Sequence, residues 1–329
     1  MKKLMLAAMA ALAITGCSQN EEFEAVSQKA PIGFNTVVSK TTRAAITELA
    51  ALRTSGFTVY AYTSPEEITT AFPSEVGTLM TAEAVTYDEA TTSWKNTKEY
   101  YWPLTNKVHF YAYATGAGAN YIAPTTSKYP GLNYTVADLA DKQKDFVVAK
   151  LQNQGKSDNA IQLSFAHALT QVNFSAVGDK AGFTYTVNSI KIVNVAKTGI
   201  YSFSDGQWTT EAPFATSYEY PINSANKAID GIVSKDLDVT DNTLMLMPQA
   251  MNADAKIVIS YTVSDATGVV YATDENGFEI SLAGKIDWEP GKKVRYTLTL
   301  GNGAVSMKFA PVVGPWGNQV NGQDPKPVE

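Results

Sequence analysis

The single cysteine of the chain, Cys17, stands where a bacterial lipoprotein precursor carries its acylated residue. Lys2 and Lys3 form a basic n-region, an apolar stretch over residues 4–14 follows, and the small residues of ITG come directly before the thiol. This is the layout of a secretory signal that ends in a lipobox. The apolar stretch is too short to cross a bilayer as a helix, which takes about 20 residues. The sequence therefore predicts a signal peptide over residues 1–16 and a diacylglycerol group on Cys17, the alternative being a buried free cysteine.

The two histidines are the other side chains suited to acid–base or metal chemistry. His109 lies between Val108 and Phe110 in a strand-like segment, and His167 lies in LSFAHALTQV beside apolar residues. The motifs HExxH, GxSxG, GxxxxGK[ST] and GxGxxG are all absent. One lipidated cysteine cannot build a zinc site. We therefore expect both histidines to be structural polar groups, and we expect no catalytic residue, no metal, no cofactor and no enzymatic activity.

A segment patterned like a core strand follows the leader. In PIGFNTVV, Ile32, Phe34, Thr36 and Val38 occupy alternate positions. This period of two indicates a strand with one apolar face. Such a strand is unexpected here, because the region after a lipidated cysteine usually serves as a flexible tether.

The arginine that follows this strand is a candidate processing site. Arg43 lies in TTRAA, between small residues that suit an extended conformation in a protease cleft. Cleavage there would separate Arg43 from Ala44 and would remove the strand. Two alternatives remain open: Arg43 is an ordinary solvated loop residue, or the nearby Arg53 is the arginine that is cleaved.

The composition narrows the class of protein. The 329 residues carry a formal net charge of −6 and show no cluster of Lys and Arg, so nucleic acid is not an expected partner. Without a second cysteine the mature chain cannot form a disulfide, and its stability must come from a buried core. A hydrophobic content of 45% is enough for such a core.

Strand-like segments rich in Val, Tyr, Phe and Thr dominate the chain, and turn residues separate them. The expected strands cover residues 56–63, 107–115, 145–150, 168–177, 183–195, 243–249, 255–263 and 293–300. Helix signals are confined to residues 45–52 and 135–143. This pattern predicts two tandem β-sandwiches, over 44–178 and 179–329, although a boundary near residues 153–159 is an alternative.

Several segments resemble, in order and spacing, the fimbrillin-like family, the lipoprotein-derived pilins of Bacteroidales. After the lipobox and TTRAA come YYWPLTNKVHFYAYAT (residues 100–115) and LSFAHALTQVNFSA (residues 163–176). LMLMPQ (residues 244–249) and WEPGKKVRYTLTL (residues 288–300) follow. The resemblance extends over nearly the whole chain and implies an all-β fold of two tandem transthyretin-like (Greek-key) β-sandwich domains with few short helices.

The resemblance also implies a maturation route and a set of partners. The precursor would be a lipoprotein of the cell outer membrane, held by the lipid on Cys17. An arginine-specific protease would cut after Arg43 and remove the propeptide, residues 17–43. The vacated groove would accept a strand from another copy or a related pilin subunit, giving a surface fimbria with a role in adhesion and a host or bacterial surface receptor as a possible partner.

The segment AVSMKFAPVV (residues 304–313) is a candidate for the donated strand. Val305, Met307 and Phe309 share one face, in the same period as the strand that would be removed. The alternative is that this segment is the last strand of its own domain, because a donated strand and a native strand have the same pattern.

Three other functions remain open at this stage. The chain could be the anchor or the tip subunit of a fimbria. It could be a monomeric surface lipoprotein that binds glycans or host protein through exposed aromatic residues. A secreted β-sandwich hydrolase is the third alternative, disfavoured by the absence of catalytic motifs.

Overall fold

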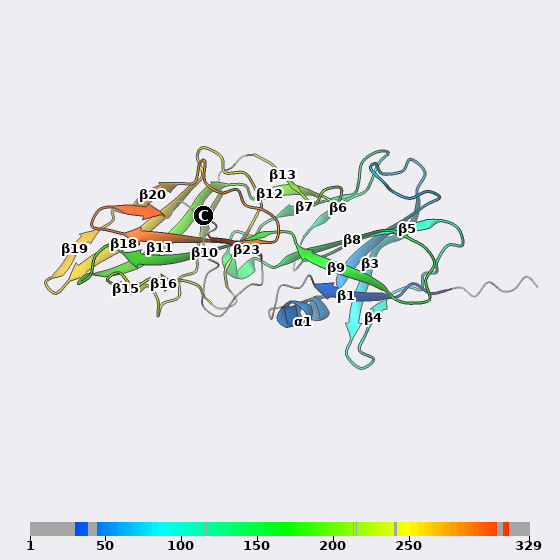
Figure 1. Ribbon diagram of the computed structural model, residues 1–329, viewed down its shortest axis with the longest axis horizontal. Coiled ribbons are helices and arrows are strands. Elements are labelled where there is room, and N and C mark those ends of the chain that lie inside the picture. Colours follow the sequence, from blue (N-terminus) through cyan, green and yellow to red (C-terminus); the bar gives the residue numbers. More distant parts are fainter. Residues whose placement is uncertain are drawn as a thin grey trace, which may run out of the picture.

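The computed structural model describes residues 30–38, 45–115, 118–212, 214, 216–239, 242–307 and 312–315. The molecule is elongated, with the strands of the N-terminal half at one end of its long axis and those of the C-terminal half at the other (Figure 1). Almost all regular structure in the described ranges is β, and the two helices are short: α1 (Ala45–Ser55) and the 3-10 helix η1 (Ala140–Lys142). The prediction of an all-β fold with few short helices is confirmed.

The N-terminal half contains a seven-stranded sheet and a four-stranded sheet. In spatial order the first consists of β1 (Phe34–Val38), β9 (Ile161–His167), β8 (Phe146–Gln154), β5 (Lys107–Thr115), β2 (Phe57–Ser64), β3 (Gly77–Asp88) and β4 (Ser93–Asn96). The second consists of β13 (Trp208–Thr210), β12 (Thr198–Ser202), β7 (Gly131–Thr135) and β6 (Asn120–Ile122).

The C-terminal half contains two six-stranded sheets. The first consists of β16 (Lys235–Asp236), β10 (Thr170–Gly178), β21 (Lys292–Leu300) and β22 (Val305–Met307), with β17 (Leu244–Leu246) on β10 and β23 (Val312–Pro315) on β21. The second consists of β14 (Thr216–Glu219), β11 (Thr184–Val195), β18 (Lys256–Asp265) and β19 (Gly268–Ala272), with β15 (Ala228–Asp230) on β11 and β20 (Phe278–Ser281) on β18. The inward positions of β18 alternate with half-buried ones, as the period of two requires.

Two apolar cores stabilise this arrangement. The larger core extends from one face of β2 and β5, through the four-stranded sheet, into the C-terminal half, and it includes Tyr62, Tyr134 and Tyr261. The smaller core lies on the opposite face of β2 and β5 and includes Phe57 and Phe110. Strands β2 and β5 are thus covered on both faces, which explains their continuous apolar and aromatic composition.

Hydrogen bonding crosses the domain boundary that we predicted between residues 178 and 179. Strand β12 pairs antiparallel with β7, so the hairpin of β12 and β13 joins the N-terminal layers although it follows β11 in the chain. The Trp208 Nε1 atom of this hairpin also donates to the Ala168 carbonyl at 2.6 Å. The hairpin therefore connects the two halves of the molecule. That residues 44–178 and 179–329 form two separate domains stays a prediction.

Candidate functional site: the leading strand and its groove

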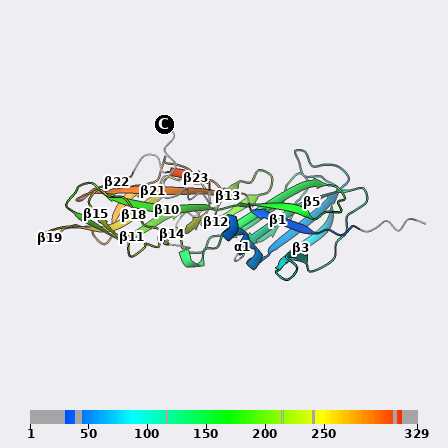
Figure 2. The ribbon, with the colours of Figure 1, turned by 60° about the horizontal axis from the view of Figure 1, so that its bottom comes forward.

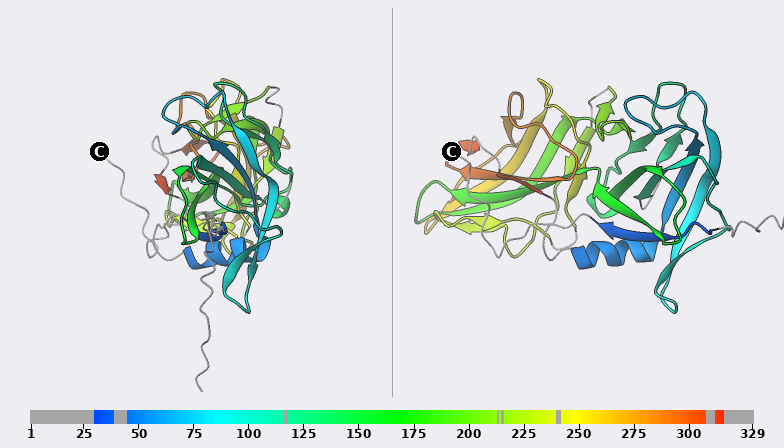
Figure 3. Two further views of the ribbon diagram at one scale, coloured as in Figure 1. Left: turned by 90° about the vertical axis from the view of Figure 1, so that its right-hand side faces the viewer. Right: turned by 45° about the vertical axis from the view of Figure 1, so that its right-hand side comes forward.

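The segment of residues 30–38, here called the leading strand, lies at the edge of the seven-stranded sheet between two parts of the chain. On one side β1 runs parallel to β9, with Phe34 opposite Ile161. On the other side Ile32 N donates to the Tyr100 carbonyl at 2.8 Å and Trp102 N donates to the Ala30 carbonyl at 3.0 Å. The leading strand therefore lies between β9 and the loop that follows β4, and it lies beside α1 on the surface of the N-terminal half (Figure 3).

The apolar face predicted for this segment points into the smaller core. Ile32 is 3% exposed and Phe34 is 2% exposed. The Phe34 ring meets the rings of Phe57 and Phe110 edge-on, at centroid distances of 5.9 and 5.8 Å. Such contacts contribute beyond the burial of apolar area alone. The leading strand thus supplies central residues of the core beneath it.

The other predicted residues of this face are less completely defined. Thr36 is half-buried and lies opposite Leu163 in the register with β9. Val38 is opposite Phe165, and its side chain lies outside the described residues. The regular strand begins at Phe34, so it is shorter than the predicted span of 32–38, although Ile32 still contributes to the core.

The leading strand lies in a groove that has β9 on one side and residues 96–102 on the other. We call residues 96–102 the wall of the groove, and the carboxylate of Glu83 holds this wall in place. Thr97 N and Thr97 Oγ1 both donate to Glu83 Oε1 at 2.6 Å, and Lys98 N donates to the same atom at 3.0 Å. The Tyr100 hydroxyl donates to Oε2 at 2.9 Å. With Glu83 only 3% exposed, this set of bonds fixes the residue whose carbonyl binds the leading strand.

The pKa of Glu83 agrees with a carboxylate that is ionised near neutral pH. Burial raises the pKa of Glu83, but the hydrogen bonds from Thr97, Lys98 and Tyr100 together outweigh it and leave the pKa below its ordinary value of 4.5. Because the folded-state pKa is lowered, the contribution of these hydrogen bonds to stability is present above pH 4.5 and is lost as the pH falls through the folded-state pKa.

We expect Glu83→Ala to lower the free energy of unfolding of the intact chain by about 3 kcal/mol, because four donors lose a charged acceptor. The matched control is Glu99→Ala, since Glu99 is an exposed carboxylate that accepts a single hydrogen bond within the described ranges, from the Tyr101 hydroxyl at 2.6 Å. The control should change stability by less than about 0.5 kcal/mol. Urea unfolding at pH 7 measures both, and equal effects would show that the wall does not depend on Glu83.

Three polar atoms of the leading strand and its wall are not satisfied within the described ranges. Thr36 Oγ1, Asn96 Oδ1 and Trp102 Nε1 are buried and have no hydrogen-bond partner among the described residues. Asn96 does bind the strand through its amide nitrogen, which donates to the Ile32 carbonyl at 2.9 Å. Each unsatisfied buried group costs about 1–3 kcal/mol. The fit of the leading strand is therefore good in its apolar contacts and incomplete in its hydrogen bonds.

The sequence positions proposed for processing and acylation lie outside the described residues: Cys17, Arg43 and Ala44. The competing arginine is described. Arg53 lies in the last turn of α1, with its guanidinium carbon 4.4 Å from the centroid of the Tyr87 ring. A protease that binds extended chain would have to unwind this turn, because Arg53 is helical. It would also have to withdraw the neighbouring Leu52 from the smaller core.

The candidate donated segment lies on the edge of its own C-terminal sheet in this structure. β22 places Val305 opposite Leu300 and Met307 opposite Leu298, and β23 pairs with the first half of β21. Phe309 lies outside the described residues. In this structure the described residues of the segment therefore form edge strands of their own domain, which is the alternative to a donated strand.

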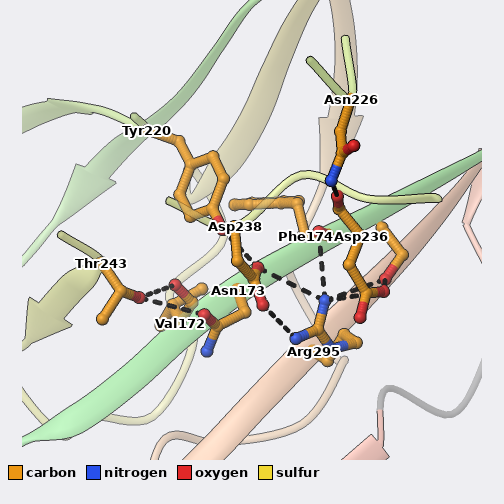
Figure 4. A network of polar contacts seen from close by, with 10 residues as sticks. Val172, Asn173, Phe174, Tyr220, Asn226, Asp236, Asp238, Thr243 and Arg295 are labelled. Atoms are coloured by element: carbon orange, nitrogen blue, oxygen red, sulfur yellow. Dashed lines mark hydrogen bonds and ion pairs between the residues drawn. The ribbon is translucent and has the colours of Figure 1, made fainter. Parts of the chain in front are cut away.

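Strand β21 is anchored independently of β22 and β23. It pairs with β10 along its length, from Gln171 opposite Lys293 to Gly178 opposite Leu300. Arg295, which is 5% exposed, forms ion pairs with Asp238 and, at 3.0 Å, with Asp236. Figure 4 shows these contacts converging on the guanidinium from the β10 side. The outer edge strands can thus leave without removing β21 from the sheet.

Among the described residues, the Ser64–His109 pair resembles a catalytic arrangement, but it is buried and has the wrong tautomer for catalysis. His109 Nδ1 accepts a hydrogen bond from Asn153 N at 3.1 Å, so the proton is on Nε2, which lies 2.8 Å from Ser64 Oγ. Ser64 in turn donates to the Glu66 carbonyl. A general base would need a free lone pair facing the hydroxyl. Burial lowers the pKa of His109 to about 4, so the ring is neutral near pH 7.

His167 also has a structural partner, since its Nδ1 lies 3.0 Å from Asp145 Oδ1. No group of three or more His, Cys, Asp or Glu side chains in the described ranges is arranged to hold a metal ion. Within the same ranges, no helix has the length and apolar character needed to cross a membrane.

Comparison with known proteins gives three results. The profile of fimbrillin-like proteins matches residues 42–316. The chain is 28% identical over 248 residues to the fimbrium subunit Fim1C of Phocaeicola vulgatus, which covers 66% of this chain and 64% of that protein's length. Among solved structures it is similar to a fimbrial protein from Bacteroides vulgatus, with a TM-score of 0.66 and 18% identity over 87% of this chain and 99% of the other.

Proposed function

The chain belongs to the fimbrillin-like family, and from this membership we propose that it is a structural subunit of a cell-surface fimbria, assembled by strand exchange after proteolysis at Arg43. The precursor would be held in the cell outer membrane by the lipid on Cys17. An arginine-specific protease would release the propeptide, residues 17–43, and copies of the chain or related pilin subunits would then join.

The observation that carries this proposal is the burial of the leading strand. Ile32 and Phe34 are core residues, yet they belong to a segment at the sheet edge that a single cut after Arg43 would detach. Removal would expose the Phe57 and Phe110 rings that now contact Phe34. An apolar groove of this kind, with free backbone groups on β9 and on Tyr100, favours the binding of another extended strand.

The incomplete hydrogen bonding of the leading strand supports its replacement. An incoming strand that satisfied Trp102 Nε1 or Asn96 Oδ1 would gain free energy that the leading strand does not supply. Strand exchange from one copy to the next is a head-to-tail contact that does not close on itself, so it produces a filament.

The proposed donor is the segment of residues 304–313, including Val305, Met307 and Phe309. Its described strand residues lie at an outer sheet edge, where they pair with β21. The anchored position of β21 allows this segment to leave while the C-terminal sheet stays intact.

A glycan-binding lipoprotein is less well supported. Tyr101, at 37% exposure, is the one aromatic residue among the large hydrophobic side chains that the described part of the chain leaves exposed. Sugar-binding surfaces need flat aromatic faces that are open to solvent, and the other aromatic residues of the described ranges are mostly taken up by the two cores.

We expect Phe309→Asp to prevent polymerisation of the mature protein while leaving the monomer folded, because a carboxylate cannot enter an apolar groove. The matched control is Ser306→Asp, since Ser306 is exposed in β22 and lies on the alternate face. Mass spectrometry of cell-surface material gives the N-terminus, expected at Ala44, and the oligomer ladder in one measurement. Wild-type ladders from Phe309→Asp, or a wild-type chain that remains monomeric and acylated on Cys17, would overturn the proposal.

A further inference from the structure

The groove has two ends, and one of them carries exposed apolar side chains. The leading strand starts at the outer end of the N-terminal half and runs toward the middle of the molecule, where it ends beside α1 (Figure 1). At its outer end Pro31 forms a bridge with Tyr101. Tyr101 is 37% exposed and Leu104 is 75% exposed. We call this outer end the mouth of the groove.

The point at which the C-terminal segment leaves its sheet lies at the opposite end of the molecule. After β21 the chain turns through Gly301–Ala304, where Gly301 N donates to the Ala304 carbonyl at 2.7 Å. The Tyr261 hydroxyl holds this turn by donating to the carbonyls of Gly301, at 2.7 Å, and Ala304, at 3.1 Å. These bonds hold the chain up to Ala304, so the turn marks the departure point of the segment.

The departure point is bordered by a strand that carries exposed apolar side chains. A Cβ atom on Gly303 would lie 3.5 Å from the Tyr271 ring of β19, so β19 borders the turn. On β19, Val269 is 69% exposed and Val270 is 40% exposed. Figure 2 shows β19 at the tip of the C-terminal half, far from β1. Exposed apolar side chains thus lie at both ends of the long axis of the molecule.

Resting on the proposed strand exchange, we infer that the incoming strand runs parallel to β9, as β1 does, so that the β19 tip of the donor subunit covers Tyr101 and Leu104 at the mouth of the acceptor. The partner is a second copy of this chain. A donated C-terminal segment is joined to its own subunit at the start of the strand. If it keeps the direction of β1, that start lies at the mouth, and the donor's departure point must lie there too.

The groove favours a strand parallel to β9 because the backbone donors and acceptors on both of its sides already match the spacing of such a strand. The Gly33 carbonyl accepts from Ile161 N at 2.9 Å, while Ile32 N donates to the Tyr100 carbonyl at 2.8 Å. A strand of the same direction reproduces both bonds in place, whereas parallel and antiparallel strands present their backbone groups at different spacings. The opposite direction would put the donor's departure point beside α1 and would leave Tyr101 and Leu104 uncovered by the donor subunit in the filament.

Cysteine cross-linking tests the direction and the contact together. Cys17 is the one cysteine of the sequence and precedes Arg43, so the proposed mature chain has no native thiol. Two single variants, Leu104→Cys and Val269→Cys, are processed, mixed and polymerised, and a short thiol-specific cross-linker is added. The expected product is a covalent Leu104→Cys–Val269→Cys dimer, absent from the unpolymerised mixture.

The matched control replaces Leu104→Cys with Ala51→Cys, because Ala51 is an exposed residue of α1 at the other end of the groove. Filaments that cross-link through Ala51→Cys, or through neither position, would overturn the proposed direction while leaving strand exchange in place. If the unmodified mature chain forms no filaments, the proposed function itself fails. The two failures are therefore distinguished in the same experiment.

Discussion

Phe34→Ala is expected to lower the free energy of unfolding of the intact chain by about 3–5 kcal/mol, the usual cost of deleting a fully buried aromatic ring. The ring is 2% exposed and meets Phe57 and Phe110, so its loss leaves a cavity between two rings that cannot follow it. Urea unfolding of the full chain measures this effect. We expect the loss of stability in the precursor alone, because in the proposed route Phe34 is removed with the propeptide before the mature subunit assembles.

The same substitution should accelerate assembly once the chain is cut. A leading strand that makes fewer contacts dissociates faster, and each 1.4 kcal/mol that is lost from the bound state corresponds to a factor of about ten. We therefore expect the oligomer ladder of Phe34→Ala to appear more than tenfold sooner after protease is added, with filaments of unchanged stability. Asn35→Ala is the control, since Asn35 is exposed and should change neither stability nor rate.

A slower ladder from Phe34→Ala would contradict strand exchange. It would mean that the leading strand supports the assembled subunit, in which case the strand does not leave. If Phe34→Ala left the free energy of unfolding of the intact chain unchanged, the packing of the Phe34 ring against Phe57 and Phe110 would be contradicted.

The alternation in residues 32–38 predicts the buried face of the leading strand because that signal is local. A period of two depends only on where successive side chains point. The partner of the strand could not be predicted in the same way. The parallel pairing of Phe34 with Ile161 joins residues far apart in the chain, and it depends on how β8 and β9 are placed by the rest of the sheet.

The wall of the groove also depends on tertiary contacts that a single sequence does not encode visibly. Glu83 lies in TAEAVTYD, where it alternates with apolar residues like a solvent-facing strand residue. Its burial results from the return of residues 97–100 across it, which supplies four donors to one carboxylate. Among the described residues of the site, a buried carboxylate of this kind is the feature that sequence reasoning missed.

The C-terminal segment illustrates a limit of a different kind. Val305 and Met307 alternate as an exchanged strand must, and they also pair with Leu300 and Leu298 as a native edge strand must. Both states need the same apolar face and the same free backbone groups, so pattern alone cannot separate them. In the proposed scheme the segment occupies both places in turn, first on its own β21 and later in a neighbour's groove.

Arg43→Ala is expected to abolish filament formation, the largest effect of any single substitution considered for this chain. Without the cut, the leading strand stays covalently attached, and its effective concentration at its own groove is far above that of any free subunit. The variant should accumulate as a folded, full-length lipoprotein whose unfolding free energy equals that of the uncut wild type. Mass spectrometry of surface material should show an acylated Cys17 and no oligomer ladder.

Two companion variants identify the arginine and the type of protease. Arg53→Ala should assemble normally, because Arg53 is held in α1 and its loss removes only a cation–π contact with Tyr87, worth about 0.5–1 kcal/mol at an exposed site. Arg43→Lys should behave like Arg43→Ala if the protease is specific for arginine, and like the wild type if it also accepts lysine. Normal filaments from Arg43→Ala together with loss of assembly in Arg53→Ala would move the cut into α1. In that case the protease would have to unwind the helix that buries Leu52 before it could release the leading strand.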